Sequence, residues 1–187
     1  MIGGLLRDRR CVAALEFGLL APTFVMGFAG VVDLGNALYT WSKLEQALAL
    51  GANYAIMNKA KVNVTSGSTV YQLADNIATI VATSNPGTAA SSTVVVNDGP
   101  TSTVANGGTP SHSGTTANAS SYYCLTGAPT SWTWGTAYAN NATACADGSQ
   151  PGQFVTITVS YSFTPFFASY GFVTNGQMTD GAAVQAN

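Results

Sequence analysis

Positive charge is almost missing from this sequence beyond its first third. The last basic residue is Lys61, and the 187-residue chain has six Lys and Arg against eight Asp and Glu. A surface that binds nucleic acid neutralises phosphates with basic side chains, so the composition excludes nucleic acid as a partner. Charged residues make up only 7% of the chain, whereas roughly 25% is usual in soluble domains. This composition argues against a cytosolic enzyme.

Catalytic and metal-binding patterns are also missing. The single histidine, His112, lies in a stretch of Ser, Thr and Gly with no acid close to it in the sequence, which predicts a solvated loop residue. Neither a CxxC motif nor a Cys/His cluster with the spacing of a zinc site occurs. We find no nucleophile–base pair, carboxylate pair or phosphate loop. The sequence therefore predicts a protein with no enzyme activity, no metal and no cofactor.

Cysteine is scarce and unevenly placed. Cys11 lies near the N-terminus, whereas Cys124 and Cys145 enclose a polar, turn-rich stretch in the second half of the chain. In an exported domain such a pair typically forms a disulfide, which predicts a closed loop over 124–145. The alternative is two unpaired thiols that only pack.

The N-terminal segment contains a long apolar run. Residues 17–32 are uncharged and mostly apolar, and only Asp33 interrupts the run before residue 42. A helix over 17–42 would be about 39 Å long, which is enough to cross a hydrocarbon core of roughly 30 Å. Three Arg precede the run within residues 1–10, which predicts a cytoplasmic N-terminus and an exported C-terminal part.

Two carboxylates lie at the ends of this run. Glu16 stands at its start, and Asp33 lies near the opposite interface. A charged group in the membrane needs a partner or water. An interfacial position near water is the simplest explanation for each of them.

Specific ordered matches point to a family. Residues 9–22, RRCVAALEFGLLAP, closely resemble the N-terminus of TadE-like proteins, the minor pseudopilins of the tight-adherence (Tad/Flp) pilus system. The resemblance continues through GVVDLGNALY at 30–39, LEQA at 44–47 and GANYA at 51–55. The region of the paired cysteines and FVTITVSYSFTPF at 154–166 is also similar to the C-terminal half of that family.

The resemblance implies processing and assembly roles for named residues. A prepilin peptidase would cut between Cys11 and Val12, although the family usually has Gly where this chain has Cys11. Glu16 would then stand at the fifth mature position and neutralise the N-terminal amine of a neighbouring pilin or pseudopilin subunit. Pro22 would kink the helix. In pilin-type helices similar prolines accompany local melting of the helix as subunits pack into a filament; the alternative is a harmless kink.

The rest of the chain predicts a small mixed domain. The apolar spacing over 43–57 predicts that the membrane helix continues as an amphipathic stalk. A second helix is expected over 70–84, with Thr69 and Gln72 as a capping box. The β-branched run at 93–97 and the alternation at 154–163 predict strands. Residues 99–121 read as a polar loop.

We therefore expect an α+β, pilin-like fold with a long membrane-spanning helix packed on a small antiparallel sheet. The expected parts are a basic leader at 1–11, a transmembrane and stalk helix at 12–60, and an exported domain at 61–187. The predicted protein is a structural minor pseudopilin that contributes to pilus assembly and adhesion. It would be anchored once in the bacterial inner membrane, in contact with the lipid bilayer, with its C-terminal domain in the periplasm or outside the cell. The alternative is a membrane-tethered, adhesin-like binding module with no role in filament assembly.

Overall fold

A long helix and a compact α+β domain make up the computed structural model, which describes residues 9–64, 66–84, 90–167 and 171–186. The side chains of residues 9–12 lie outside the described part. The elements in chain order are α1 (Arg9–Met57), η2 (Lys59–Lys61), α2 (Gly67–Thr83), β1 (Ser91–Val96), β2 (Thr101–Val104), β3 (Ser111–Ser113), β4 (Thr126–Ala128), β5 (Ser131–Thr133), β6 (Phe154–Ser162) and β7 (Gln177–Gln185). This arrangement confirms the predicted α+β class.

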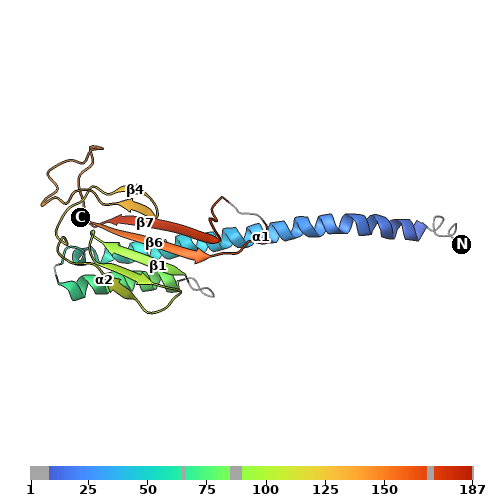
Figure 1. Cartoon of the computed structure of the whole chain (residues 1–187), viewed down its shortest axis with the longest axis horizontal. Coiled ribbons are helices and arrows are strands. Elements are labelled where there is room, and N and C mark those ends of the chain that lie inside the picture. The colour runs from blue at the N-terminus through green and yellow to red at the C-terminus, as the bar shows by residue number, and fades with distance from the viewer. Residues whose placement is uncertain (1–8, 65, 85–89, 168–170, 187) are drawn as a thin grey trace.

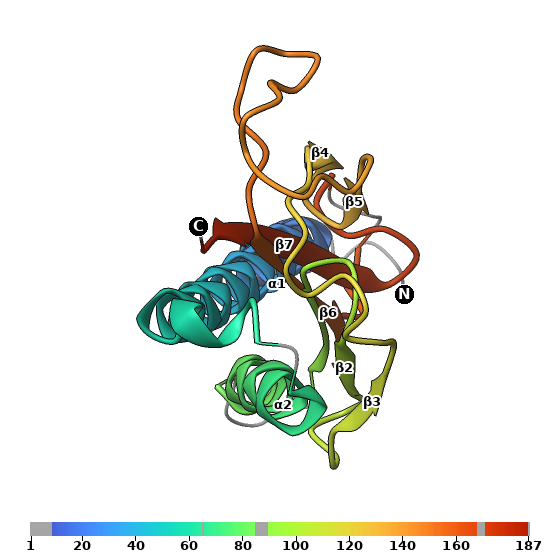
Figure 2. The ribbon, with the colours of Figure 1, turned by 90° about the vertical axis from the view of Figure 1, so that its left-hand side faces the viewer.

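The main sheet has five antiparallel strands in the order β3-β2-β1-β6-β7. Helices α1 and α2 lie side by side on one face of this sheet (Figures 1 and 2). The small hairpin of β4 and β5 lies on the other side, next to β7. Thr130, in the turn between β4 and β5, lies very close to Gly181 of β7. A Cβ atom added to Gly181 would lie 2.9 Å from the backbone nitrogen of Thr130.

The core fills the space between the sheet and the two helices. In β6 the alternate residues Val155, Ile157 and Val159 are buried, as the alternation of the sequence predicted. The buried face of α2 covers them with small and medium apolar side chains, namely Val70, Leu73, Ala74, Ile77, Ala78, Val81 and Ala82. Burial of these apolar surfaces supplies the main driving force for folding the domain.

Helix α1 belongs to the domain over only its second half. From Ala37 onward one side of α1 is buried against α2, β6 and β7. Before that point the helix projects beyond the main sheet as a rod, and the connection between β6 and β7 contacts it at Asp33 (Figure 1). The stretch Ala13–Met57 is long and apolar enough to cross a membrane, and its most apolar window has no buried residue. Nearly every large apolar side chain before Ala37 is exposed, so this part of the helix has the surface of a membrane span.

The start of α2 differs from the sequence prediction. The helix begins at Gly67 with Ser66 as N-cap, three residues earlier than expected, and it ends at Thr83. Thr69 is therefore inside the first turn and does not form the predicted capping box with Gln72. Val70, in this first turn, is fully buried and belongs to the apolar face of α2 that packs on the core.

The polar segment 99–121 also differs from the prediction, because it contains two strands. Asn97 and Asp98 both have positive φ angles, and Gly99 N donates to Val96 O, so the chain makes a tight hairpin turn. This turn places β2 and then β3 at the edge of the sheet. Ser102 is fully buried, and its hydroxyl donates to Asp75 Oδ1 at 2.6 Å, which satisfies the buried polar group.

Candidate functional site

The predicted processing site lies at the free end of α1. Residues 1–8 of the predicted leader lie outside the described residues. The backbone at Cys11 and Val12 is helical and belongs to the first turn of α1. This end is the most distant part of the chain from the sheet (Figure 1). A partner can therefore reach the bond between Cys11 and Val12 without touching the folded domain.

Glu16 lies on the exposed surface of α1, next to the strongly exposed Phe17. Among the residues that the structure describes, no hydrogen bond or ion pair to Glu16 is formed. In a helix, Glu16 lies one turn after Val12 on the same side. The carboxylate is thus in a position to interact with a group outside the chain.

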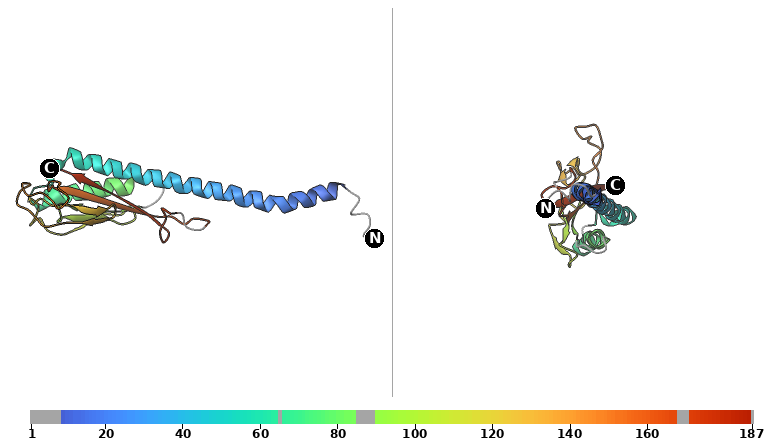
Figure 3. Two further views of the ribbon diagram at one scale, coloured as in Figure 1. Left: turned by 90° about the horizontal axis from the view of Figure 1, so that it is seen from above. Right: turned by 90° about the vertical axis from the view of Figure 1, so that its right-hand side faces the viewer.

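Pro22 lies inside α1, which continues through it as one helix. Proline has no N–H, so the carbonyl four residues earlier, at Gly18, loses its usual helical donor. The N-terminal, blue part of the helix changes direction in Figure 3. A break of the helix into two elements, which proline can also cause, does not occur.

Asp33 has a structural partner that the sequence did not reveal. Its side chain is only 3% exposed, although the residues around it on α1 are exposed. Oδ2 of Asp33 accepts hydrogen bonds from the backbone N–H of Phe166 at 3.0 Å and of Phe167 at 3.3 Å. Both donors belong to the connection between β6 and β7. The expectation that water reaches Asp33 is therefore wrong, because its carboxylate is buried and paired with backbone N–H groups.

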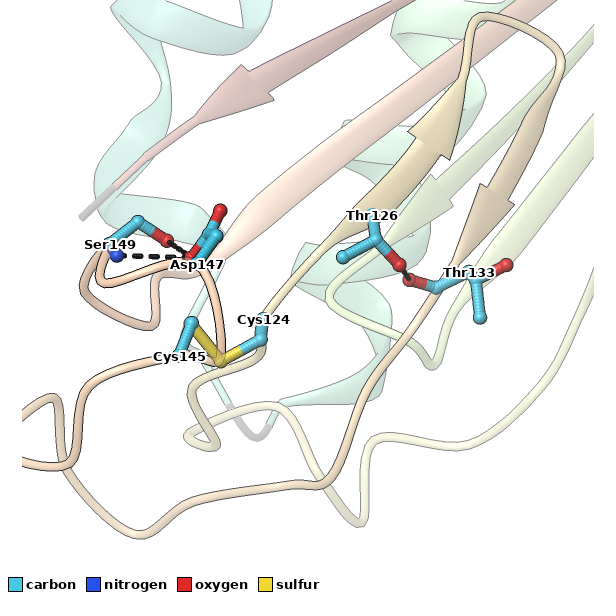
Figure 4. Close-up of a disulfide and its surroundings, with 6 residues drawn as sticks. All are labelled: Cys124, Thr126, Thr133, Cys145, Asp147 and Ser149. Carbon is cyan, nitrogen blue, oxygen red and sulfur yellow. Dashed lines mark hydrogen bonds between the residues drawn. A yellow bond between two sulfur atoms is a disulfide. The ribbon is translucent and has the colours of Figure 1, made fainter.

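Cys124 and Cys145 form the predicted disulfide, with their Cα atoms 5.7 Å apart. Figure 4 shows the bond beside a tight turn in which Asp147 accepts hydrogen bonds from the backbone and the hydroxyl of Ser149. These two bonds lower the pKa of Asp147. On the other side of the bond, Tyr123 pairs with Gly152 through two backbone hydrogen bonds. The disulfide thus closes a largely exposed loop onto an anchored backbone position.

The buried side chain of Asn97, directly after β1, ties the end of this strand to the segment that precedes Cys124. Nδ2 of Asn97 donates to the carbonyl oxygens of Ala119 and Ser121, both at 2.9 Å, and more weakly to Asn118 at 3.3 Å. Partial desolvation raises the pKa of Asp98, although this residue is exposed, and burial raises the pKa of Tyr123; the charge of Asp98 raises the pKa of Tyr123 further. These contacts position the chain that leads to the disulfide.

His112 lies in strand β3 and not in a loop. Its Nδ1 is 3.6 Å from Oδ2 of Asp75, and its ring lies 4.7 Å from that of Tyr71. The imidazole is about half exposed, so water competes for these contacts. Among the described residues, His, Cys, Asp and Glu nowhere form a group of three that could hold a metal. The contacts of His112 tie edge strand β3 to helix α2.

An open cleft of about 640 Å³ lies between α1, the β4–β5 turn and the ends of β6 and β7. Its aromatic wall is formed by Trp41 and Phe172, whose ring centroids lie 5.7 Å apart. The other wall carries hydroxyl and amide groups from Thr130, Thr158, Thr174, Gln177 and Thr179. Such a combination of aromatic and uncharged polar groups could hold a neutral polar ligand.

Comparison with known proteins places the family signal on α1. The family described as TadE-like protein matches residues 12–53. Searches of curated proteins and of solved structures gave no match. The matched segment contains Glu16, Pro22 and Asp33, and it ends where α1 is packed on the sheet. The segment 12–53, which includes the apolar rod and most of the packed half of α1, is thus a TadE-like segment. This match confirms the resemblance over the N-terminal part of the chain, whereas the similarity at 154–166 and around the paired cysteines stays a prediction.

Proposed function

We propose that this protein is a structural, non-catalytic pseudopilin of a Tad-type pilus, held in the bacterial inner membrane by the free half of α1. The observation that carries this proposal is the TadE-like segment on an exposed apolar helix. The basic residues near the N-terminus favour a cytoplasmic N-terminus. The disulfide favours an oxidising compartment for the folded domain.

A prepilin peptidase is the proposed partner at the N-terminus. It would cut between Cys11 and Val12 and leave a new amino group on Val12. The position of this bond at the far end of a projecting helix supports the proposal, because a membrane enzyme can reach it. The protein is then the substrate of the reaction and contributes no catalytic group.

Glu16 is proposed to interact with the new N-terminal amine of a neighbouring subunit. Its exposed position within an apolar surface supports this role, since an unpaired carboxylate among lipid or apolar side chains is costly. A cation from a second subunit would offset that cost during assembly. Packing of the apolar rods of several subunits would provide the core of the filament, and the exported domains would provide its adhesive outer surface.

The intact mass of the protein from its native membrane, measured without reducing agent, tests the processing step. We expect a mass that lacks residues 1–11. A further deficit of two hydrogens relative to the reduced form is expected from the disulfide. A full-length mass would contradict processing and would favour a plain membrane anchor.

Substitution of Glu16 tests the assembly step. Glu16→Ala is expected to leave the protein in the membrane but to prevent its incorporation into pili, measured by recovery of the protein in sheared pilus fractions. The matched control is Glu45→Ala, because Glu45 is an exposed carboxylate on the packed half of the same helix. Equal incorporation of the two variants would contradict the proposed role of Glu16.

The cleft beside Trp41 favours a second candidate function, that of a membrane-tethered binding module. Its aromatic wall and ring of Thr and Gln side chains suit uncharged polar ligands such as glycans. In this case Thr179→Arg, which would fill the cleft, abolishes binding to glycan arrays, and Glu16→Ala has no effect. A pseudopilin without ligand binding gives the opposite pattern.

A further inference from the structure

The connection between β6 and β7 reaches outside the domain and touches α1. In Figure 1 the described part of this connection extends past the ends of β6 and β7 and lies beside the helix. The two hydrogen bonds from the backbone of Phe166 and Phe167 to Asp33 fix it there. A charged acceptor makes such bonds stronger than ordinary ones. The connection therefore has a defined place on α1, close to the start of the packed half.

The side chains of these two phenylalanines remain largely uncovered. Phe166 is 89% exposed and Phe167 is 39% exposed. Together with Phe28, Ala29 and Val32 of α1, they line an open, almost wholly apolar groove of about 550 Å³. An exposed phenylalanine held in place by its backbone is unusual in water, because its burial elsewhere would be favourable.

The groove lies near the C-terminal end of the part of α1 that could span a membrane. Residues 13–32 are 20 helical positions, most of them apolar and with Glu16 as their one charged residue, and they span about 30 Å. This length equals the thickness of a typical hydrocarbon core. The groove is thus continuous with the exposed apolar surface of the rod. Asp33, which follows directly, is shielded from lipid by the two N–H donors.

We propose that Phe166 and Phe167 dip into the outer edge of the bilayer and form a second membrane contact beside the α1 span. Asp33 is the positioning residue that holds this contact at a fixed depth. The domain would then rest on the membrane at two points, and its orientation to the bilayer would be fixed. The proposal requires only that the rod spans the membrane, and it does not depend on processing or on filament assembly.

Fluorescence quenching by brominated lipids tests this contact. The full chain with Phe166→Trp is placed in nanodiscs that hold one copy each, and its emission is compared with that of the unsubstituted protein. We expect the additional emission to be blue-shifted and to be lost for the most part when the lipids carry bromine near the top of the acyl chains. The matched control is Asn141→Trp in the exposed disulfide-closed loop, whose additional emission should be red-shifted and unquenched.

Substitution of Asp33 tests whether its carboxylate holds Phe166 in the bilayer or only lies close to it. In the Phe166→Trp background, Asp33→Ala should reduce the quenching, whereas Asp33→Asn, which keeps an accepting oxygen, should retain more of it. The near-UV circular dichroism spectrum of each variant, compared with that of the unsubstituted protein, reports that its domain is folded. Unquenched emission of Phe166→Trp in folded protein would overturn the proposal. A blue shift that appears only in discs with two or more copies would show instead that the groove takes the helix of a second subunit.

Discussion

The two halves of α1 differ in a way that their hydrophobicity alone does not show. Before Ala37, large side chains such as Phe17, Phe24 and Phe28 point outward and are exposed. After that point the buried positions are mostly small or aliphatic: Ala37, Leu44, Ala47, Leu48, Gly51 and Ala55. A helix that is apolar on all sides suits lipid, whereas a narrow stripe of small residues suits close packing on a sheet. Size and spacing therefore divide this helix into a membrane part and a domain part.

Leucine truncation should show the largest difference between the halves. Leu44→Ala removes a side chain that is 1% exposed, and we expect the free energy of unfolding of the domain to fall by about 2–5 kcal/mol. Leu19→Ala, in the rod, should leave that free energy unchanged because Leu19 contacts no core. Denaturant titration of both variants in nanodiscs, followed by tryptophan emission, measures the effect. Equal losses would mean that the rod is part of the cooperative unit.

The three cysteines allow a similar comparison. The double substitution Cys124→Ala and Cys145→Ala removes the bond between two residues that are 21 positions apart in the sequence. We expect the free energy of unfolding to fall by about 3 kcal/mol. The physical reason is the larger conformational freedom of the unfolded chain without the bond. In the unprocessed full-length chain, Cys11→Ala at the end of the rod serves as the control and should leave the free energy of unfolding unchanged. Unchanged stability of the double variant in the same titration would show that the loop unfolds independently of the sheet.

Substitution of glycine by alanine should change the stability of the protein by less than the variants above. The change should have opposite signs in the two halves of α1. A Cβ at Gly51 would lie 2.5 Å from Cγ2 of Val81, a stiff and fully buried side chain. Overpacking of this kind costs about 1–3 kcal/mol, which exceeds the roughly 0.5–1 kcal/mol that alanine gains over glycine in a helix. A Cβ at Gly35 would meet nothing within 4 Å.

We therefore expect a lower melting temperature for Gly51→Ala and an equal or higher one for Gly35→Ala. Calorimetry of both variants in nanodiscs measures the difference. A stabilised Gly51→Ala variant would show that α1 and α2 can move apart at little cost.

The smallest expected effect concerns pH and is restricted to the domain. Because partial desolvation raises the pKa of Asp98, the folded state binds its proton more tightly than the unfolded state does. The corresponding stability is present below the ordinary pKa of an aspartate and is lost as the pH rises through the raised value. Asp98→Asn should remove this loss, so its stability should fall less than that of the unsubstituted protein between pH 3 and 6. Parallel pH profiles in thermal melts would contradict this assignment.

Local patterns predicted those parts of the fold that depend on neighbours in the sequence. The alternation in β6 and the apolar run of α1 predict these elements correctly, because the spacing of apolar residues within each segment indicates its secondary structure and its apolar surface. The contact of Asp33 with Phe166 joins residues 133 positions apart, and no local pattern encodes it.

The sequence predicts a loop where strand β2 lies, for a similar reason. Its Thr and Ser residues resemble a polar linker, and burial of Ser102 is acceptable only because Asp75, on another element, accepts its hydrogen bond. The three carbonyl partners of Asn97 could not be foreseen either, since they come from a turn more than 20 residues away. A signal was present in the sequence, namely a carboxylate within the apolar run at Asp33 and two adjacent large apolar residues at Phe166 and Phe167.

The continuity of α1 has a mechanical consequence. A pull on the rod enters the domain along the helix axis, and α1 lies beside β6 and β7 over the whole of its packed half. The load is therefore shared as shear among the side chains from Leu44 to Ala55 and does not concentrate at one hinge. The disulfide-closed loop lies off this path, and the bond protects the loop without bearing tension.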